Sequence, residues 1–188
     1  KIEIGKDSGG IIQAVNRLSR GRIEILKLDA QWHEKPLPGA WFEVKNAKTG
    51  ELFRMVTGSD GKAVSEELPA AYLGDDGRAV PYEYQVREIQ APEGFCLDHR
   101  VWKFWFNNDH TPVAVQKIKA ENEETRLWFS KSSFHTDHFV KGARLSIYNA
   151  KAENGKMQPW GEPLETWISG PEPHLVSGKL SGGRTYFL

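Results

Sequence analysis

Three polar residues lie at positions where the strand pattern of this sequence calls for apolar side chains. They are Lys27, in line with Ile23 and Ile25; Glu88, in line with Tyr84 and Val86; and Asn122, in line with Ile118 and Ala120. Alternate residues of a strand point to the same face, so each polar group is expected on an inward face. A buried charge is costly unless it is paired, neutralised or consumed by a reaction. The pattern therefore predicts one buried cluster of an amine, a carboxyl group and a carboxamide.

The segments that carry these residues predict an all-β chain. Short alternating or aromatic-rich runs are separated by clusters of Gly, Asn, Asp and Pro, which is typical of strands joined by turns. The predicted strands include 22–29, 40–44, 52–56, 82–89, 101–106 and 113–120. Their spacing of roughly ten residues favours a small β-sandwich. Residues 11–18 could form a short helix, although 11–15 could equally form a strand.

The composition excludes several classes of function. The chain has 25 basic and 25 acidic residues among 188 and no basic block, which argues against nucleic-acid binding. No apolar run approaches the roughly 20 residues of a membrane-spanning helix. The single cysteine, Cys96, excludes an internal disulfide and a cysteine-based metal cluster. We predict no cofactor and no metal, and we interpret the chain, which shows no initiator Met, signal peptide or sorting tail, as a fragment of a longer protein.

An internal repeat organises the chain. Lys27 is followed by a loop, a Gly-Ala pair and the strand 41–44, and Lys131 is followed by a loop, a Gly-Ala pair and the strand 144–147. The repeat predicts three parts, which are the C-terminal hairpin of a preceding repeat (1–18), a complete repeat (19–124) and the N-terminal part of a further repeat (125–188). We also expect that residues 1–16 could dock against the third part, within one molecule or between neighbours.

A longer motif connects this pattern to a known family. The segment 84–95 reads Tyr-Gln-Val-Arg-Glu-Ile-Gln-Ala-Pro-Glu-Gly-Phe. It resembles the Tyr-x-Leu-x-Glu-x-x-Ala-Pro-x-Gly-Tyr signature of the Cna protein B-type (SpaA-like) domains of Gram-positive pilins and surface adhesins, with Val86 and Phe95 as departures. Shorter motifs of the family match in order at 26–29, 38–43, 57–61, 67–69 and 120–122.

This resemblance implies an immunoglobulin-like (prealbumin-like) Greek-key β-sandwich, repeated in tandem, and one reaction. In the family, a first-strand lysine and a last-strand asparagine form an isopeptide bond spontaneously, assisted by an acidic residue. Carried over to this sequence, Lys27 and Asn122 form the crosslink and Glu88 is the catalytic acid. Lys131 and Asn16 match the bond partners in the partial repeats, although neither part has a glutamate at the catalytic position.

The proposed chemistry requires these residue types. Amide formation needs a neutral amine, and lysine in water is almost fully protonated at neutral pH. Because burial disfavours the charged form, Lys27 can pass a proton to Glu88 and become a nucleophile. Protonated Glu88 could then polarise the side-chain carbonyl of Asn122 and pass a proton to the departing ammonia. The chain would act once on itself, so we do not expect an enzyme.

Each of these residues also has an ordinary interpretation. Lys27 could extend to solvent, Glu88 could pair with Arg87 or Lys103, and Asn122 could be a turn residue. The His-Thr-Asp-His stretch at 135–138 resembles a metal site, but a solvated loop fits better because no further ligands lie nearby.

The function that fits best is a structural stalk segment of a pilin or adhesin, extracellular and anchored to the cell wall of a Gram-positive bacterium. Its partners would be neighbouring repeats of the same polypeptide. The alternative is an adhesive module that binds a host matrix protein or a glycan through its loops or some of its seven tryptophans. Trp102 and Trp105 cannot both enter one core from a regular strand, so we expect one of them to be exposed or covered by a neighbouring domain.

Overall fold

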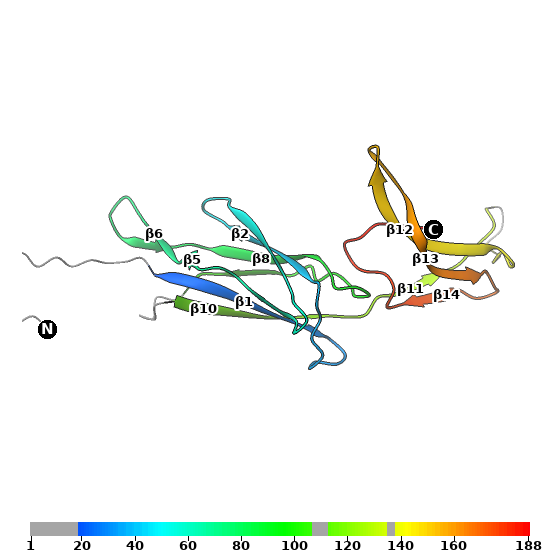
Figure 1. Ribbon diagram of the computed structural model, residues 1–188, viewed down its shortest axis with the longest axis horizontal. Coiled ribbons are helices and arrows are strands. Elements are labelled where there is room, and N and C mark those ends of the chain that lie inside the picture. The colour runs from blue at the N-terminus through cyan, green and yellow to red at the C-terminus, as the bar shows by residue number, and fades with distance from the viewer. Residues whose placement is uncertain (1–18, 107–112, 135–137) are drawn as a thin grey trace, which may run out of the picture.

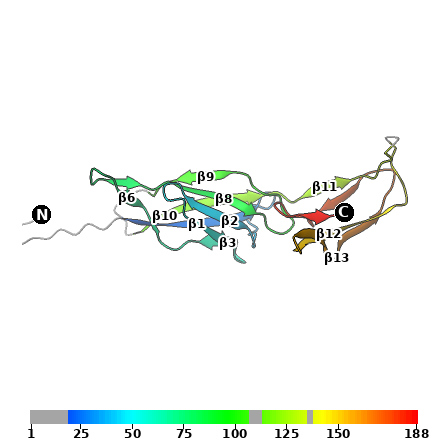
Figure 2. The same ribbon diagram turned by 90° about the horizontal axis from the view of Figure 1, so that it is seen from above.

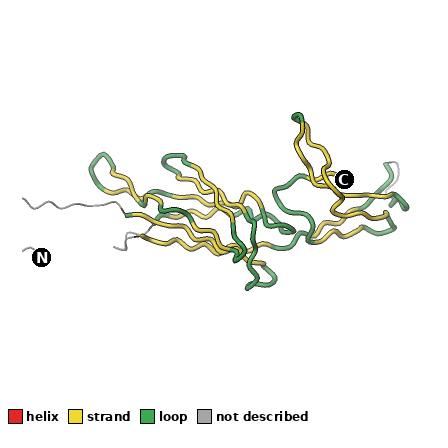
Figure 3. The backbone as a smooth tube through the Cα atoms, viewed as in Figure 1, coloured by secondary structure: helices red, strands yellow, loops and turns green. Residues whose placement is uncertain are grey.

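The computed structural model describes residues 19–106, 113–134 and 138–188. All fifteen regular elements in these residues are β-strands, and Figure 3 accordingly contains no helix colour. No helix long and apolar enough to cross a membrane is therefore found in the described part of the chain. The predicted all-β class is confirmed. The predicted hairpin of residues 1–16, including Asn16, lies outside the described residues.

The first body of the molecule is built from two sheets (Figures 1 and 2). Its strands are β1 (Arg20–Asp29), β2 (Trp41–Asn46), β3 (Leu52–Val56), β4 (Lys62–Val64), β5 (Leu68–Pro69), β6 (Ala71–Leu73), β7 (Ala79–Pro81), β8 (Tyr84–Gln90), β9 (Val101–Phe104) and β10 (Val113–Asn122). One sheet has the order β10-β1-β4, with β5 also paired to β1, and the other has the order β3-β2-β8-β9. The short strands β6 and β7 form a separate ribbon.

The first and last strands of this body are parallel neighbours. β1 and β10 pair along their whole length, from Arg20 opposite Val113 to Asp29 opposite Asn122. Parallel strands cannot be joined by a tight hairpin, so the intervening chain crosses over and forms the rest of the sandwich. Residues that are far apart in the sequence are thereby fixed side by side.

The core of the first body follows the alternation that the sequence shows. Its largest fully buried apolar side chains come from β1, β2 and β8, and they are Ile23, Ile25, Phe42, Val44, Tyr84 and Val86. Full burial of one such side chain contributes about 1.5–3 kcal/mol. Trp102 packs against this core, whereas Trp105 is 56% exposed. The expectation that only one of the two tryptophans enters the core is confirmed.

A second body follows. Its strands are β11 (Arg126–Phe129), β12 (Arg144–Glu153), β13 (Lys156–Ile168), β14 (His174–Ser177) and β15 (Tyr186–Phe187). β11 pairs with β14, and a second sheet has the order β13-β12-β15. The turn between β12 and β13 is Asn154-Gly155, whose positive φ angles of 51° and 74° suit a tight hairpin. A small core is formed by Ile147, Trp167, Val176 and Leu180.

The two bodies share a strand pairing and a set of hydrogen bonds between loops. Asn46 lies opposite Tyr84 in the first body, and Asn149 lies opposite Tyr186 in the second. The Gly-Ala pair before β2 forms hydrogen bonds with Thr57, which follows β3. The Gly-Ala pair before β12 forms the same hydrogen bonds with Ser169. The two bodies thus share these contacts, and their origin as tandem repeats stays a prediction.

Hydrogen bonds between backbone groups, and between backbone groups and two side-chain hydroxyls, join the two bodies. The contacts connect 91–95, which follow β8, with the loop 178–182, and they involve Thr125 between the bodies. The hydrogen bonds are Gly182 N to Phe95 O (2.8 Å), Ala91 N to Gly182 O (3.3 Å), Gly94 N to Ser181 Oγ (3.0 Å), Thr125 Oγ1 to Leu180 O (2.6 Å) and Thr125 N to Gly94 O (2.8 Å). These contacts therefore hold residues 91–95, which follow the strand of Glu88, against the second body.

Candidate functional site

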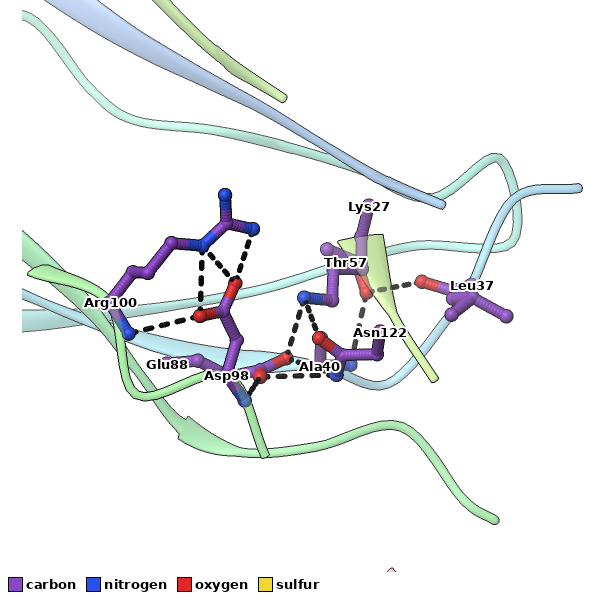
Figure 4. Close-up of polar contacts among 8 residues, drawn as sticks. All are labelled: Lys27, Leu37, Ala40, Thr57, Glu88, Asp98, Arg100 and Asn122. Atoms are coloured by element: carbon purple, nitrogen blue, oxygen red, sulfur yellow. Dashed lines mark hydrogen bonds and ion pairs between the residues drawn. The ribbon is translucent and has the colours of Figure 1, made fainter. Parts of the chain in front are cut away.

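Three strands bring Lys27, Glu88 and Asn122 together at one end of the first body (Figure 4). In the parallel register of β1 and β10, Lys27 lies opposite Ala120. Asn122 is two residues further along β10 and so points to the same face. Glu88 comes from β8 in the facing sheet, where it pairs with Phe42 of β2. The cluster thus spans the interior between the two sheets.

All three side chains are buried. The exposed fractions are 0% for Lys27, 4% for Glu88 and 3% for Asn122. Lys27 does not extend to solvent, and Arg87 pairs with Glu43 (2.6 Å) instead of Glu88. The structure therefore contains neither a solvent-exposed Lys27 nor an ion pair between Glu88 and Arg87.

Each of the three groups contacts the other two. The Nζ of Lys27 donates a hydrogen bond to Oδ1 of Asn122 and lies 3.1 Å from Oε1 of Glu88. The Nδ2 of Asn122 donates to Oε1 and Oε2 of Glu88 at 3.0 and 3.1 Å. The sequence-based mechanism predicts that Glu88 faces the carbonyl oxygen of Asn122. Glu88 instead faces the amide nitrogen, because the carbonyl oxygen accepts a hydrogen bond from Lys27.

The surroundings of Lys27 favour its neutral form more than water does. Desolvation lowers the pKa of Lys27 below the ordinary 10.5, and this effect outweighs the opposing influence of the Glu88 charge and hydrogen bond. The ring of Phe42 lies 5.5 Å from Nζ, and Trp102 packs against Phe42 with 6.3 Å between ring centroids. These aromatic rings form an apolar wall beside the amine.

Sequence reasoning missed two residues next to this cluster. The backbone N–H of Asp98 donates to Oε2 of Glu88 at 2.7 Å, and the Asp98 carboxylate binds the guanidinium of Arg100 (Figure 4). Both residues belong to the loop between β8 and β9, which has no alternation to show which side chains face inward. The Asp-x-Arg spacing is the one signal in the sequence, and it is weak.

Of the counterparts predicted in the partial repeats, Lys131 lies within the described residues. Lys131 lies in the loop after β11 and is exposed, because that loop leaves the strand before the lysine is reached. Asn16 lies outside the described residues, and so does most of the stretch 135–138. Among the described residues, no group of His, Cys, Asp or Glu is arranged to hold a metal ion.

A family model described as SpaA, prealbumin-like fold domain, matches residues 21–121, which contain Lys27 and Glu88 and end one residue before Asn122. The chain therefore belongs to this family, in agreement with the resemblance found in its sequence motifs. No curated protein sequence matches the chain.

Solved structures with similarity to the chain include the three that follow. They are the Bacillus anthracis TIE protein (24% identity, TM-score 0.44, 87% of this chain and 32% of that one), the shaft pilin SpaA from Lactobacillus rhamnosus GG as a D295N mutant (14%, 0.47, 89% and 85%) and BcpA, the major pilin subunit of Bacillus cereus (19%, 0.44, 57% and 31%). The chain thus spans about a third of the length of the Bacillus anthracis protein. The family assignment depends on the family model and not on these structures.

Proposed function

We propose that this chain is a structural stalk segment of a Gram-positive pilin or cell-surface adhesin, locked by an isopeptide bond between Lys27 and Asn122. The observation that carries the proposal is the closed triangle of contacts among Lys27, Glu88 and Asn122 in a buried site. A buried lysine in contact with a carboxylate can become neutral by passing its proton to it, and Glu88 is the carboxylate in contact with Lys27.

The reaction balances with the groups that are present. Lys27 gives a proton to Oε1 of Glu88, 3.1 Å away, and its neutral Nζ attacks Cγ of Asn122. A new C–N bond forms, and the bond from Cγ to Nδ2 breaks. Glu88, 3.0 Å from Nδ2, passes its proton to that nitrogen, which leaves as ammonia, and takes up the second proton that Nζ loses as the amide forms, so Glu88 ends protonated. Fixed proximity can supply about 7–11 kcal/mol of the barrier in well-oriented intramolecular reactions.

The position of the proposed bond suits a domain that is under tension. β1 and β10 are the first and last strands of the body and run parallel, so tension applied at the two ends shears them past each other. A bond from Lys27 to Asn122 carries that tension directly and bypasses the chain between them. The intervening sheets would then stay folded under load.

The proposal extends to the organisation and the location of the protein. Residues 19–124 form one crosslinked repeat and 125–188 belong to a further one, as the matching strand registers support. Residues 1–18 belong to a preceding repeat. Such repeats would be displayed outside the cell on a wall-anchored protein, with neighbouring repeats as partners. The crosslinking occurs once per chain, so the protein is not an enzyme.

An adhesive role is the second candidate, and exposed tryptophans favour it. Trp32 is 64% exposed and Trp128 is 66% exposed. Trp32 and Trp128 lie on different bodies, whereas a surface that binds a glycan needs aromatic side chains that lie close together. Solid-phase binding to matrix proteins and glycans, with Trp32→Ala and Trp128→Ala variants, would distinguish adhesion from a purely structural role.

The intact mass of the purified chain tests the main proposal. The wild-type chain should be lighter than its encoded sequence by one ammonia, and Lys27→Ala and Glu88→Gln variants should have their full encoded masses. Lys119→Ala, which changes an exposed lysine of β10, is the matched control and should still lose ammonia. A wild-type mass equal to the encoded one would refute the proposal.

A further inference from the structure

The loop between β8 and β9 carries an ion pair that the reaction above does not use. The side chain of Asp98 is 8% exposed, and that of Arg100 is 59% exposed. Arg100 Nε lies 3.0 Å from both carboxylate oxygens of Asp98, and Nη2 lies 2.7 Å from Oδ2. The backbone N–H of Arg100 also donates to Oδ1 at 2.9 Å, so the pair closes a tight turn.

This turn fixes the orientation of the acid. The backbone N–H of Asp98 donates to Oε2 of Glu88 at 2.7 Å. With Oε2 held there, Oε1 lies 3.1 Å from the Nζ of Lys27. A carboxyl group that rotated freely would not keep one oxygen in position to accept the proton.

The ion pair also controls the charge near the amine. Within the described part of the chain, the charged groups with the largest effect on Lys27 are Glu88 from β8 and Asp98 and Arg100 from the loop. β2 and β10 present Phe42 and Asn122, which carry no charge. The Asp98 charge favours the ammonium form of Lys27 and the Arg100 charge opposes it.

The Asp98 carboxylate itself stays ionised beside the site. Burial alone would raise the pKa of Asp98, but the hydrogen bonds and the charge of Arg100 bring it below 3.8. Without Arg100, Lys27 would face a second carboxylate with no cation to offset it, and charges interact strongly where water is scarce. The ammonium form, which cannot attack the carboxamide, would then be favoured.

We propose that Asp98 and Arg100 are positioning residues for the crosslinking reaction. Asp98 orients Glu88 through its backbone, and Arg100 holds the turn and offsets the Asp98 charge that faces Lys27. Arg100 also lies over the ring of Trp102, with 5.2 Å from Cζ to the centroid, and so connects the turn to the apolar wall beside the amine. This inference rests on the proposed function, because it concerns the rate of the same reaction.

The test is the rate of ammonia loss after refolding, measured by intact mass across a pH series. The chain is synthesised directly into urea, where the site is not assembled, and is refolded by dilution. Arg100→Gln should slow the reaction at neutral pH by about tenfold, which corresponds to a shift of one pH unit in the deprotonation of Lys27. Its rate should recover as the pH rises.

Three further variants separate charge from geometry. D98N/R100Q removes both charges, so its pH profile should return to that of the wild type. Arg100→Lys keeps the cation but loses the two-pronged contact, so it should keep the wild-type pH profile at a reduced rate. Arg87→Gln is the matched control, since Arg87 has the same 59% exposure and pairs with Glu43, away from the site. Thermal unfolding of each variant establishes that it is folded.

The outcomes are distinct. A wild-type chain that crosslinks together with an Arg100→Gln variant of unchanged rate and pH profile would overturn this inference alone. Equal slowing of Arg100→Gln and D98N/R100Q, with no shift of the pH profile, would show that Arg100 acts only through structure and would overturn the charge argument. A folded wild-type chain that loses no ammonia would overturn the proposed function and this inference with it.

Discussion

Lys27 is the residue on which the account depends, and its position could be predicted from the sequence. Its place in line with two isoleucines, and the matching places of Glu88 and Asn122, indicate three inward-facing polar groups, and all three are buried. The contribution of Asp98 could not be predicted, because it acts through a backbone N–H in a loop without periodicity. The orientation of the Asn122 carboxamide was also beyond prediction, since it depends on which partner each amide atom meets in three dimensions.

A variant that cannot crosslink should become more stable as the pH rises. In Asn122→Ala the folded pKa of Lys27 lies below the unfolded value of 10.5, so between these two values the unfolded chain binds more protons. Stability then increases with pH over that window and levels off above 10.5. Urea unfolding at a series of pH values measures this slope.

The control for this slope is the double variant K27M/N122A, which removes the titrating amine and keeps most of its volume. Its unfolding midpoint should change less with pH over the same window. If the single and double variants had equal slopes, the lowered pKa of buried Lys27 would be contradicted.

At the scale of elements, the pairing of β1 with β10 is what brings the crosslink partners together. The strand 52–56 was predicted with the bounds that the structure has, and 113–120 was predicted two residues short of the observed end of β10. The parallel register between Lys27 and Ala120 could not be read from either strand alone. The register depends on the crossover connections of the whole sandwich. The family resemblance implied these connections, whereas the alternation of apolar and polar residues did not.

Loss of the crosslink should reduce the stability of the first body substantially. Glu88→Gln preserves the shape of the side chain but removes the acid, so the bond should not form. The partners are 95 residues apart, and the loop-closure model for disulfides gives about 4–5 kcal/mol for a loop of this size. Chemical unfolding of the variant against the wild type measures the difference.

Glu43→Gln is a suitable control for this measurement. Glu43 is a strand glutamate in an ion pair outside the site, and its partner Arg87 is 59% exposed. A pair that water reaches on one side contributes about 0–1 kcal/mol. A Glu88→Gln variant that unfolded at the same denaturant concentration as Glu43→Gln would argue against a stabilising bond.

At the scale of the whole molecule, the two bodies meet through backbone atoms packed closely at glycines. A Cβ atom on Gly182 would lie 2.2 Å from the backbone nitrogen of Leu97, and one on Gly94 would lie 2.5 Å from the oxygen of Gly178. The second body contacts the segment between Glu88 and Asp98 in this way. The repeat and its boundaries stay predictions from the sequence. The contact between the bodies arises from loops of both and could not be predicted from either part alone.

Gly182→Ala should loosen the joint while leaving both cores intact. The added Cβ would collide with backbone, which cannot move aside as a flexible side chain can. We expect faster proteolytic cleavage near residue 125 and in the loop 178–182, with the first body still resistant. Limited proteolysis followed by mass analysis measures this.

The comparison for the joint is Gly170→Ala, where a Cβ meets nothing within 4 Å. That variant should be cleaved at the wild-type rate. Equal cleavage of Gly182→Ala and the wild type would mean that the glycine contact does not hold the bodies together.

The most direct test of the central claim is a peptide map of the digested wild-type chain. The account predicts one branched peptide in which the segment containing Lys27 is joined to the segment containing Asn122, lighter than their sum by one ammonia, with fragmentation placing the link on these two side chains. Recovery of both segments as separate linear peptides, each at its encoded mass, would contradict it.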